Sequence, residues 1–135
     1  IEKLLKDNHT KRIVTIGQFA KDIPTLLKQK SFFKSYLHEE DRVGEYNNGE
    51  IKINGLDINK GLDKLEAIES LKINASLDAI IINHRDWDDV RTTGLGFDQI
   101  DLLIISNSTP YDKQMISLMK KYKRKGYINK IKNVD

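Results

Sequence analysis

The stretch AIIINHRDWDDVRTTGLGFDQIDLLIIS, residues 79–106, decides the fold of this chain. It includes most of two apolar segments, SLDAIIIN (76–83) and IDLLIIS (100–106). Both are rich in Ile and too short for isolated buried helices, which is typical of strands covered on both faces of a parallel sheet. We therefore expect these two segments to form the centre of a sheet.

The residues between the two expected strands predict a short helix. Asp86 is suited to cap a helix over WDDVRTT (87–93). Gly94 is suited to end it, because glycine adopts the left-handed conformation at low cost. A helix in this position leaves room for a parallel crossover connection.

The flanking segments continue this alternation of helices and strands. GLDKLEAIESLK (61–72) has the pattern of an amphipathic helix. After the second strand we expect a helix with Thr109 as N-cap, Pro110 in its first position and Asp112 as the acid of a capping box. We expect that helix to end at Gly126, and YINKI (127–131) to form a last strand at the sheet edge.

The first half of the chain has a different pattern. IEKLLKDNH (1–9) predicts a helix, KRIVTIG (11–17) a strand, and residues 18–37 two short helices meeting near Pro24. VGEYNNGEIKING (43–55) predicts a β-hairpin that turns at its Asn-Asn-Gly. This order is similar to that of a winged-helix module, in which the hairpin is the wing. The first 57 residues carry ten Lys and Arg against nine Asp and Glu, so a small α+β subdomain is an equally good interpretation.

Together these patterns predict an α/β or α+β protein. Residues 1–57 would form a helical subdomain with a hairpin, and residues 58–135 a small, mostly parallel sheet flanked by helices. A single compact domain, or a piece of a longer chain with partner domains elsewhere, stays open as an alternative.

The composition limits the class of protein. The 135 residues are 39% hydrophobic and 32% charged, as in ordinary globular proteins. There is no cysteine, which excludes disulfides and thiolate metal sites and fits a reducing compartment, so we expect a cytoplasmic location. No apolar run reaches the ~18 residues of a membrane span, and no leader pattern opens the chain, so we expect no membrane partner.

A basic run near the C-terminus carries our leading functional hypothesis. Residues 113–135 hold eight Lys and Arg against one acidic side chain. Five cations and one aromatic residue gather in KKYKRK: Lys120, Lys121, Tyr122, Lys123, Arg124 and Lys125. Cations at a helix C-terminus interact favourably with its dipole, but five exceed that need. We therefore expect a noncatalytic binding module that contacts nucleic acid or an acidic protein surface, and that needs no cofactor.

Polar residues at the ends of the two central strands suggest an alternative. Ligands of parallel sheets bind beyond the carboxyl ends of the strands. The first strand is followed by candidate catalytic residues, namely His84, Asp86, Asp88 and Asp89; the second ends in candidate anion-binding residues, namely Ser106, Asn107, Ser108 and Thr109. Carboxylates beside a phosphate site could hold Mg²⁺, as in a nuclease-like, metal-dependent phosphoester-processing enzyme. Helix capping and solvated loops explain the same residues without any ligand.

A third hypothesis is a structural or assembly domain. It would pair with another chain through the expected edge strand YINKI.

Overall fold

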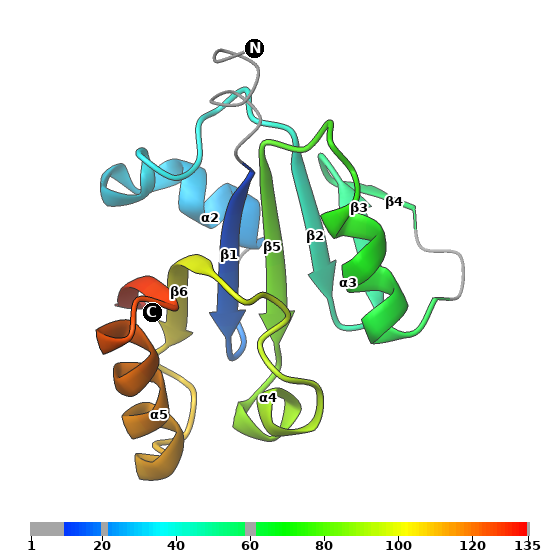
Figure 1. Ribbon diagram of the computed structural model, residues 1–135. Coiled ribbons are helices and arrows are strands. Elements are labelled where there is room, and N and C mark those ends of the chain that lie inside the picture. Colours follow the sequence, from blue (N-terminus) through cyan, green and yellow to red (C-terminus); the bar gives the residue numbers. More distant parts are fainter. Residues whose placement is uncertain (1–9, 20–21, 59–61, 135) are drawn as a thin grey trace.

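The computed structural model describes residues 10–19, 22–58 and 62–134. The centre of the protein is a seven-stranded sheet with the strand order β4-β3-β2-β5-β1-β6-β7. The strands are β1 (Lys11–Ile16), β2 (Val43–Asn47), β3 (Glu50–Ile53), β4 (Leu56–Asp57), β5 (Ala79–His84), β6 (Ile100–Ser106) and β7 (Ile128–Val134). From β2 to β7 all neighbours are parallel, whereas β3 and β4 are added by antiparallel pairing. The protein is thus an α/β protein with a mostly parallel sheet, as predicted (Figure 1).

Both apolar segments form strands, but the two strands are not neighbours. β1 lies between β5 and β6 and runs parallel to both, with Ile13 beside Ile81 on one side and Leu102 on the other. These three side chains are buried in one layer of the core. The short β-branched strand from the first half of the chain is therefore the middle one of the five parallel strands, β2, β5, β1, β6 and β7.

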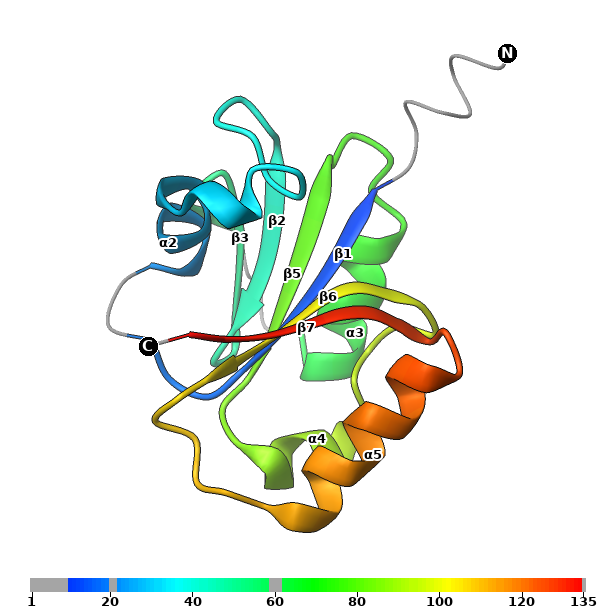
Figure 2. The same ribbon diagram turned by 90° about the vertical axis from the view of Figure 1, so that its left-hand side faces the viewer.

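Helices cover both faces of the sheet. They are α2 (Ile23–Gln29), α3 (Lys64–Lys72), α4 (Trp87–Thr93) and α5 (Lys113–Arg124), with a 3-10 helix at Ser31–Phe33. α2 packs on one face, and α3, α4 and α5 pack on the other (Figure 2). No helix of the described residues is long and apolar enough to cross a bilayer.

The direction of each connection explains this division. Crossovers between parallel strands are right-handed, so connections that run in opposite directions along the sheet place their helices on opposite faces. The connection from β1 to β2 carries α2 toward one edge, and the connections that carry the other helices run toward the opposite edge. The chain therefore changes direction at β1, and ligands of doubly wound sheets bind at such a switch point.

The hairpin of the first half is confirmed, but the winged-helix-like order is not. β2 and β3 turn through Asn48 and Gly49, both with positive φ, as their residue types predict. β2 also pairs with β5, so the hairpin extends the central sheet and is not a separate wing. The helix expected at 1–9 lies outside the described residues. Strands from residues 1–57 and from 58–135 share one sheet.

Two predictions about helix ends are wrong. Pro24 lies in the first turn of α2, and the element that follows is the 3-10 helix, so no two α-helices of the described chain meet at Pro24. Asp112, not Thr109, caps α5, because its carboxylate accepts the N–H of Met115 at 3.1 Å. The expected cap of α4 by Asp86 and its end at Gly94 are confirmed.

Candidate functional site

A polar hollow of about 500 Å³ lies at the switch point, beyond the carboxyl ends of β1, β2 and β5. We call it the switch-point hollow, and eight of the described residues line it: Gly17, Gln18, Phe19, Ile23, Asn47, Asn48, Asn83 and Arg85. Sites for small molecules commonly have volumes of about 300–1,000 Å³. The hollow therefore has the position and size of a ligand site in a doubly wound sheet.

A chain of hydrogen bonds crosses three neighbouring strands at this hollow. The Thr15 hydroxyl donates to the Asn83 amide oxygen at 2.7 Å, and the Asn83 amide nitrogen donates to the Asn47 amide oxygen at 3.1 Å. The Asn47 amide nitrogen then reaches a Glu45 carboxyl oxygen at 3.5 Å. These contacts fix the orientation of both amides, so the side chains at the hollow are held in place before any ligand arrives.

Glu45 is a buried acid at the end of this chain of bonds. Only 4% of it is exposed. Burial raises the pKa of its carboxyl group, and the nearby charge of Asp22 raises that pKa further, while the Asn47 bond opposes the change. The hollow therefore lies beside an acid that resists ionisation.

Arg85 supplies the one cationic side chain among the described residues that line the hollow. Its backbone N–H donates to Asp89 at 3.0 Å. In the described part of the chain its guanidinium group has no hydrogen bond or ion pair, and the side chain is exposed. An unpaired guanidinium group is well suited to bind a carboxylate or phosphate through two parallel hydrogen bonds.

The predicted anion-binding residues join the loop after β6 to the loop after β1. Ser106 donates to the Gln18 carbonyl oxygen at 2.9 Å, and Thr109 donates to the Ile16 carbonyl oxygen at 3.2 Å. Ser106 and Ser108 share a hydrogen bond of 2.7 Å, and the Asn107 N–H donates to Val134 at 2.7 Å. These groups therefore stabilise the edge of the site; a role in binding an anion stays a prediction.

Gly17 permits this close contact between the two loops. Its φ is +108°, and a Cβ atom built on it would lie 2.2 Å from the Thr109 hydroxyl oxygen and 2.8 Å from the Ser106 Cβ. Any side chain here would force the β6 loop outward, away from β1.

His84 lies on the opposite face of the sheet from Asn83, in a cluster with Lys64 and Asp89. Lys64 Nζ contacts His84 Nδ1 at 2.9 Å and donates to Asp89 at 2.7 Å, and His84 Nε2 contacts the Leu95 carbonyl oxygen at 3.1 Å. His84 is completely buried. Since the lysine ammonium can only donate, Nδ1 accepts and Nε2–H donates to Leu95.

Burial and charge fix the protonation states in this cluster. Burial, assisted by the Lys64 charge, lowers the pKa of His84 to about 4, so the imidazole is neutral near pH 7. Burial opposes ionisation of Asp89, but hydrogen bonds from Lys64 and the Arg85 N–H outweigh it and lower the pKa of that carboxyl group. The cluster is an ion pair beside a neutral histidine with both ring nitrogens bonded.

The other two candidate carboxylates also have protein partners. Asp86 accepts the Asp89 N–H at 2.9 Å as the cap of α4. Asp88 pairs with Arg91 at 2.9 Å, and Arg91 also pairs with Asp112, which joins α4 to the start of α5. Within residues 10–19, 22–58 and 62–134, no three His, Asp or Glu side chains gather where they could hold a metal ion. The phosphoester-enzyme hypothesis stays a prediction.

The basic run forms the last turn of α5 and the turn after it, as expected. Its five cations, Lys120, Lys121, Lys123, Arg124 and Lys125, are exposed. None of them forms an ion pair within the described part of the chain. Tyr122 is half-buried against the apolar core, and its ring centroid lies 6.0 Å from that of Tyr127, which is more exposed. The cations are therefore available to a partner, whereas Tyr122 is partly used in packing.

Comparison with known proteins adds no relative, since no protein-family model matches the chain and no curated protein is significantly similar to it.

Sequence reasoning missed three residues that organise this region, namely Thr15, Glu45 and Lys64. Thr15 and Lys64 lie 68 and 20 positions from Asn83 and His84, the residues they contact, whereas Glu45 lies on the hairpin strand β2 and contacts Asn47 of the same strand. One signal was present: side chains alternate along a strand, so the consecutive Asn83 and His84 had to lie on opposite faces.

Proposed function

We propose that the protein binds a small anionic molecule in the switch-point hollow. The observation that carries this proposal is the Arg85 guanidinium group, which has no partner among the described residues, on the wall of a polar hollow at the point where the chain changes direction. A guanidinium group in this position favours a phosphate or a carboxylate.

The other groups around the hollow suit the neutral, polar part of such a molecule. Asn48 is exposed, and Asn47 and Asn83 are held by the hydrogen bonds described above. Amide groups both donate and accept, so they suit hydroxyl or amide groups of a ligand. The volume of about 500 Å³ exceeds the needs of a single phosphate ion. The ligand class is therefore a phosphorylated or carboxylated small metabolite.

The test is ligand-dependent thermal stability, with inorganic phosphate and adenosine diphosphate as probes. A ligand that binds only the folded state raises its midpoint of unfolding. We expect at least adenosine diphosphate to raise the midpoint of the wild type and of Arg124→Gln, a control with the same charge change at a distant site. Arg85→Gln should lose most of the increase. Equal stabilisation of Arg85→Gln, or a wild type that neither probe stabilises, would overturn the proposal.

A second candidate function is the binding of a polyanion, either nucleic acid or an acidic protein surface, by the basic end of α5. It is supported by five exposed cations that have no ion pair within the described residues. Binding of this kind releases counterions and weakens steeply with salt.

The corresponding experiment measures binding of a fluorescent single-stranded oligonucleotide over a salt series. Lys120→Glu/Lys123→Glu/Lys125→Glu should weaken binding. It should also reduce the slope of log affinity against log salt concentration by about 0.7 for each phosphate contact that is lost. Lys34→Glu/Lys113→Glu/Lys130→Glu changes the net charge by the same amount on other exposed lysines and should retain more affinity. If the two triple variants lose affinity equally, only the net charge matters, and no binding surface on α5 is needed.

A further inference from the structure

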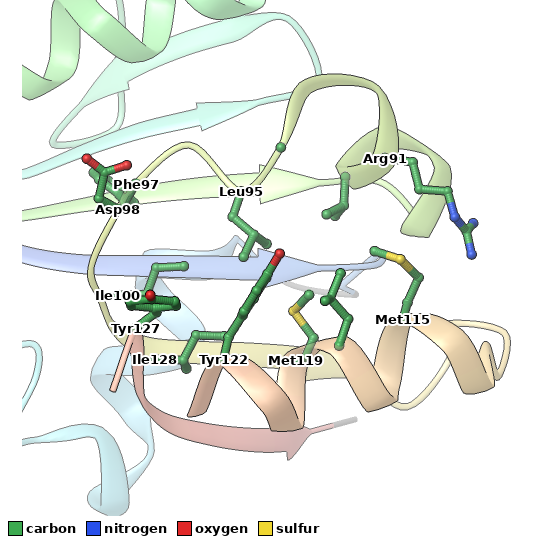
Figure 3. A pocket seen from close by; sticks show the side chains of 13 residues that line it. Arg91, Leu95, Phe97, Asp98, Ile100, Met115, Met119, Tyr122, Tyr127 and Ile128 are labelled. Atoms are coloured by element: carbon green, nitrogen blue, oxygen red, sulfur yellow. The ribbon is translucent and has the colours of Figure 1, made fainter. Parts of the chain in front are cut away.

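An apolar groove lies beside the same basic helix, between α5 and the segment that follows α4. It has a volume of about 630 Å³. Leu95 lies on one wall, Met115, Met119 and Tyr122 come from α5, and Ile100 and Ile128 come from the two outer parallel strands (Figure 3). We call this the α4–α5 groove.

The short length of α4 explains why the groove exists. α4 has seven residues and is ~10 Å long, whereas the seven residues of β6 span ~23 Å. After Gly94 the chain continues to β6 without helical structure. The helix layer on this face is therefore incomplete beside the C-terminal half of α5, and apolar side chains of β6 and β7 lie beneath the gap.

The gap has the geometry of a helix-binding groove. Neighbouring helices pack with their axes 8–10 Å apart, so a helix beside α5 would lie over Ile100 and Ile128. Helices bind such grooves through apolar residues at positions i, i+3, i+4 and i+7. Leu95, Leu118 and Tyr122 are partly exposed in the groove, whereas Met115 and Met119, which also line it, are buried.

The charges on the rim indicate the chemistry of the partner. A second hollow, which shares Arg91, Met115 and Leu118 with the groove, is bordered by Lys121 and Arg124. α5 contains no acidic residue. The charge of Arg91 is balanced by its two aspartate partners, whereas Lys121 and Arg124 have no ion pair among the described residues. Asp98, an exposed carboxylate, also lines the groove, so an occupant needs acidic side chains where it meets Lys121 and Arg124 and none beside Asp98.

We propose that the α4–α5 groove docks an amphipathic helix of a partner protein, with its apolar face on Leu95, Leu118 and Tyr122 and its acidic flank on Lys121 and Arg124. This inference rests on the polyanion-binding function proposed above and names the partner. Nucleic acid would use the cations, but its phosphates gain nothing from the apolar groove. The proposal accounts for both features together.

The test uses a fluorescent model peptide of about 16 residues, ~24 Å as a helix, with Leu at helical spacing and Glu on one flank. A scrambled peptide of the same composition lacks the apolar face and is the peptide control. Fluorescence anisotropy measures binding to the wild type and to three double variants, whose folding is checked by circular dichroism. The first, Leu95→Gln/Leu118→Gln, changes the groove. The second, Lys121→Gln/Arg124→Gln, changes its rim, and the third, Lys113→Gln/Lys130→Gln, is a charge-matched control.

We expect the amphipathic peptide to bind the wild type and the control pair, and to lose about tenfold or more in affinity for each of the other two pairs. The docking proposal is overturned if the scrambled peptide binds equally well, or if the leucine pair has no effect while the Lys121 and Arg124 pair does. Those results leave polyanion binding intact. If neither peptide nor the oligonucleotide binds, both proposals fail.

Discussion

Acid destabilises this protein through His84, and the magnitude follows from the geometry around its ring. The neutral imidazole accepts from Lys64 and donates to Leu95 while completely buried. Protonation would place a second positive charge beside the lysine ammonium group in a site without water-exposed surface. The folded state therefore resists a proton that the unfolded state binds readily.

The sign and the pH window can be worked out from the two pKa values. In the unfolded chain His84 titrates near its ordinary pKa of 6.5, and in the folded protein near 4. Between these values the unfolded state binds more protons, so stability is full above pH 6.5 and is lost as the pH falls toward 4. A difference of ~2.5 pKa units at 1.36 kcal/mol per unit corresponds to about 3 kcal/mol.

The assay is urea unfolding at a series of pH values between about 7 and 4. His84→Gln can keep a donor to Leu95 but does not titrate, so it should be less stable than the wild type near neutral pH and lose less stability on acidification. His38→Gln removes an exposed histidine and is the matched control. Other titrating groups contribute equally to all three proteins. If wild type and His84→Gln lose the same free energy of unfolding between pH 6.5 and 4, the buried neutral histidine is refuted.

Three other predictions follow from the site. Because burial raises the pKa of Glu45 above 4.5, ionisation of this carboxyl group destabilises the folded state as the pH rises. Glu45→Gln should therefore be more stable than the wild type in urea near pH 8, and the difference should vanish near pH 4.5. A variant that is less stable than the wild type at every pH would contradict this. Gly17→Ala should lower the free energy of unfolding in denaturant by about 1–3 kcal/mol. The loss should be smaller in a Thr109→Ala background, because that change removes the oxygen atom that the new Cβ would strike. If the losses of the two single variants simply add in the double variant, the contact is contradicted. Because Asp88 is paired with Arg91, ~10 mM Mg²⁺ should leave the thermal midpoint unchanged, whereas an increase that Asp88→Asn abolishes would support the phosphoester-enzyme hypothesis.

Local sequence patterns predicted the helices and strands themselves better than they predicted which strands lie side by side. β5 and β6 were found because continuous Ile-rich runs are unusual outside buried strands, and the hairpin because its turn needs residues that tolerate positive φ. The place of β1 between them could not be read from local sequence, since strand pairing depends on contacts between distant segments. An amphipathic pattern does not fix the burial of each apolar residue in it: Leu65 of α3 is 59% exposed.

The candidate site could be located only in part from the sequence, because its residues come from distant segments of the chain. The carboxyl ends of the central strands were identified as the ligand edge, and Asn83 and Arg85 do line a hollow there. His84, Asp86, Asp88 and Asp89 were expected to act together after the first strand, yet His84 contacts Lys64 on the face of the sheet opposite to Asn83 and the hollow. Competition between two good caps explains the error at α5: Thr109 is engaged by Ile16, which leaves Asp112 to cap the helix.

The central position of β1 also determines when the protein can fold. The Thr15–Asn83 bond joins residues 68 positions apart, and the Thr109–Ile16 bond joins residues 93 positions apart. Loops of this length must close before β1 has any neighbour, which makes folding slower than in proteins with mostly local contacts. During synthesis β1 leaves the ribosome before β5 and stays unpaired until β5 follows, so the growing chain exposes this strand and is open to aggregation in that interval.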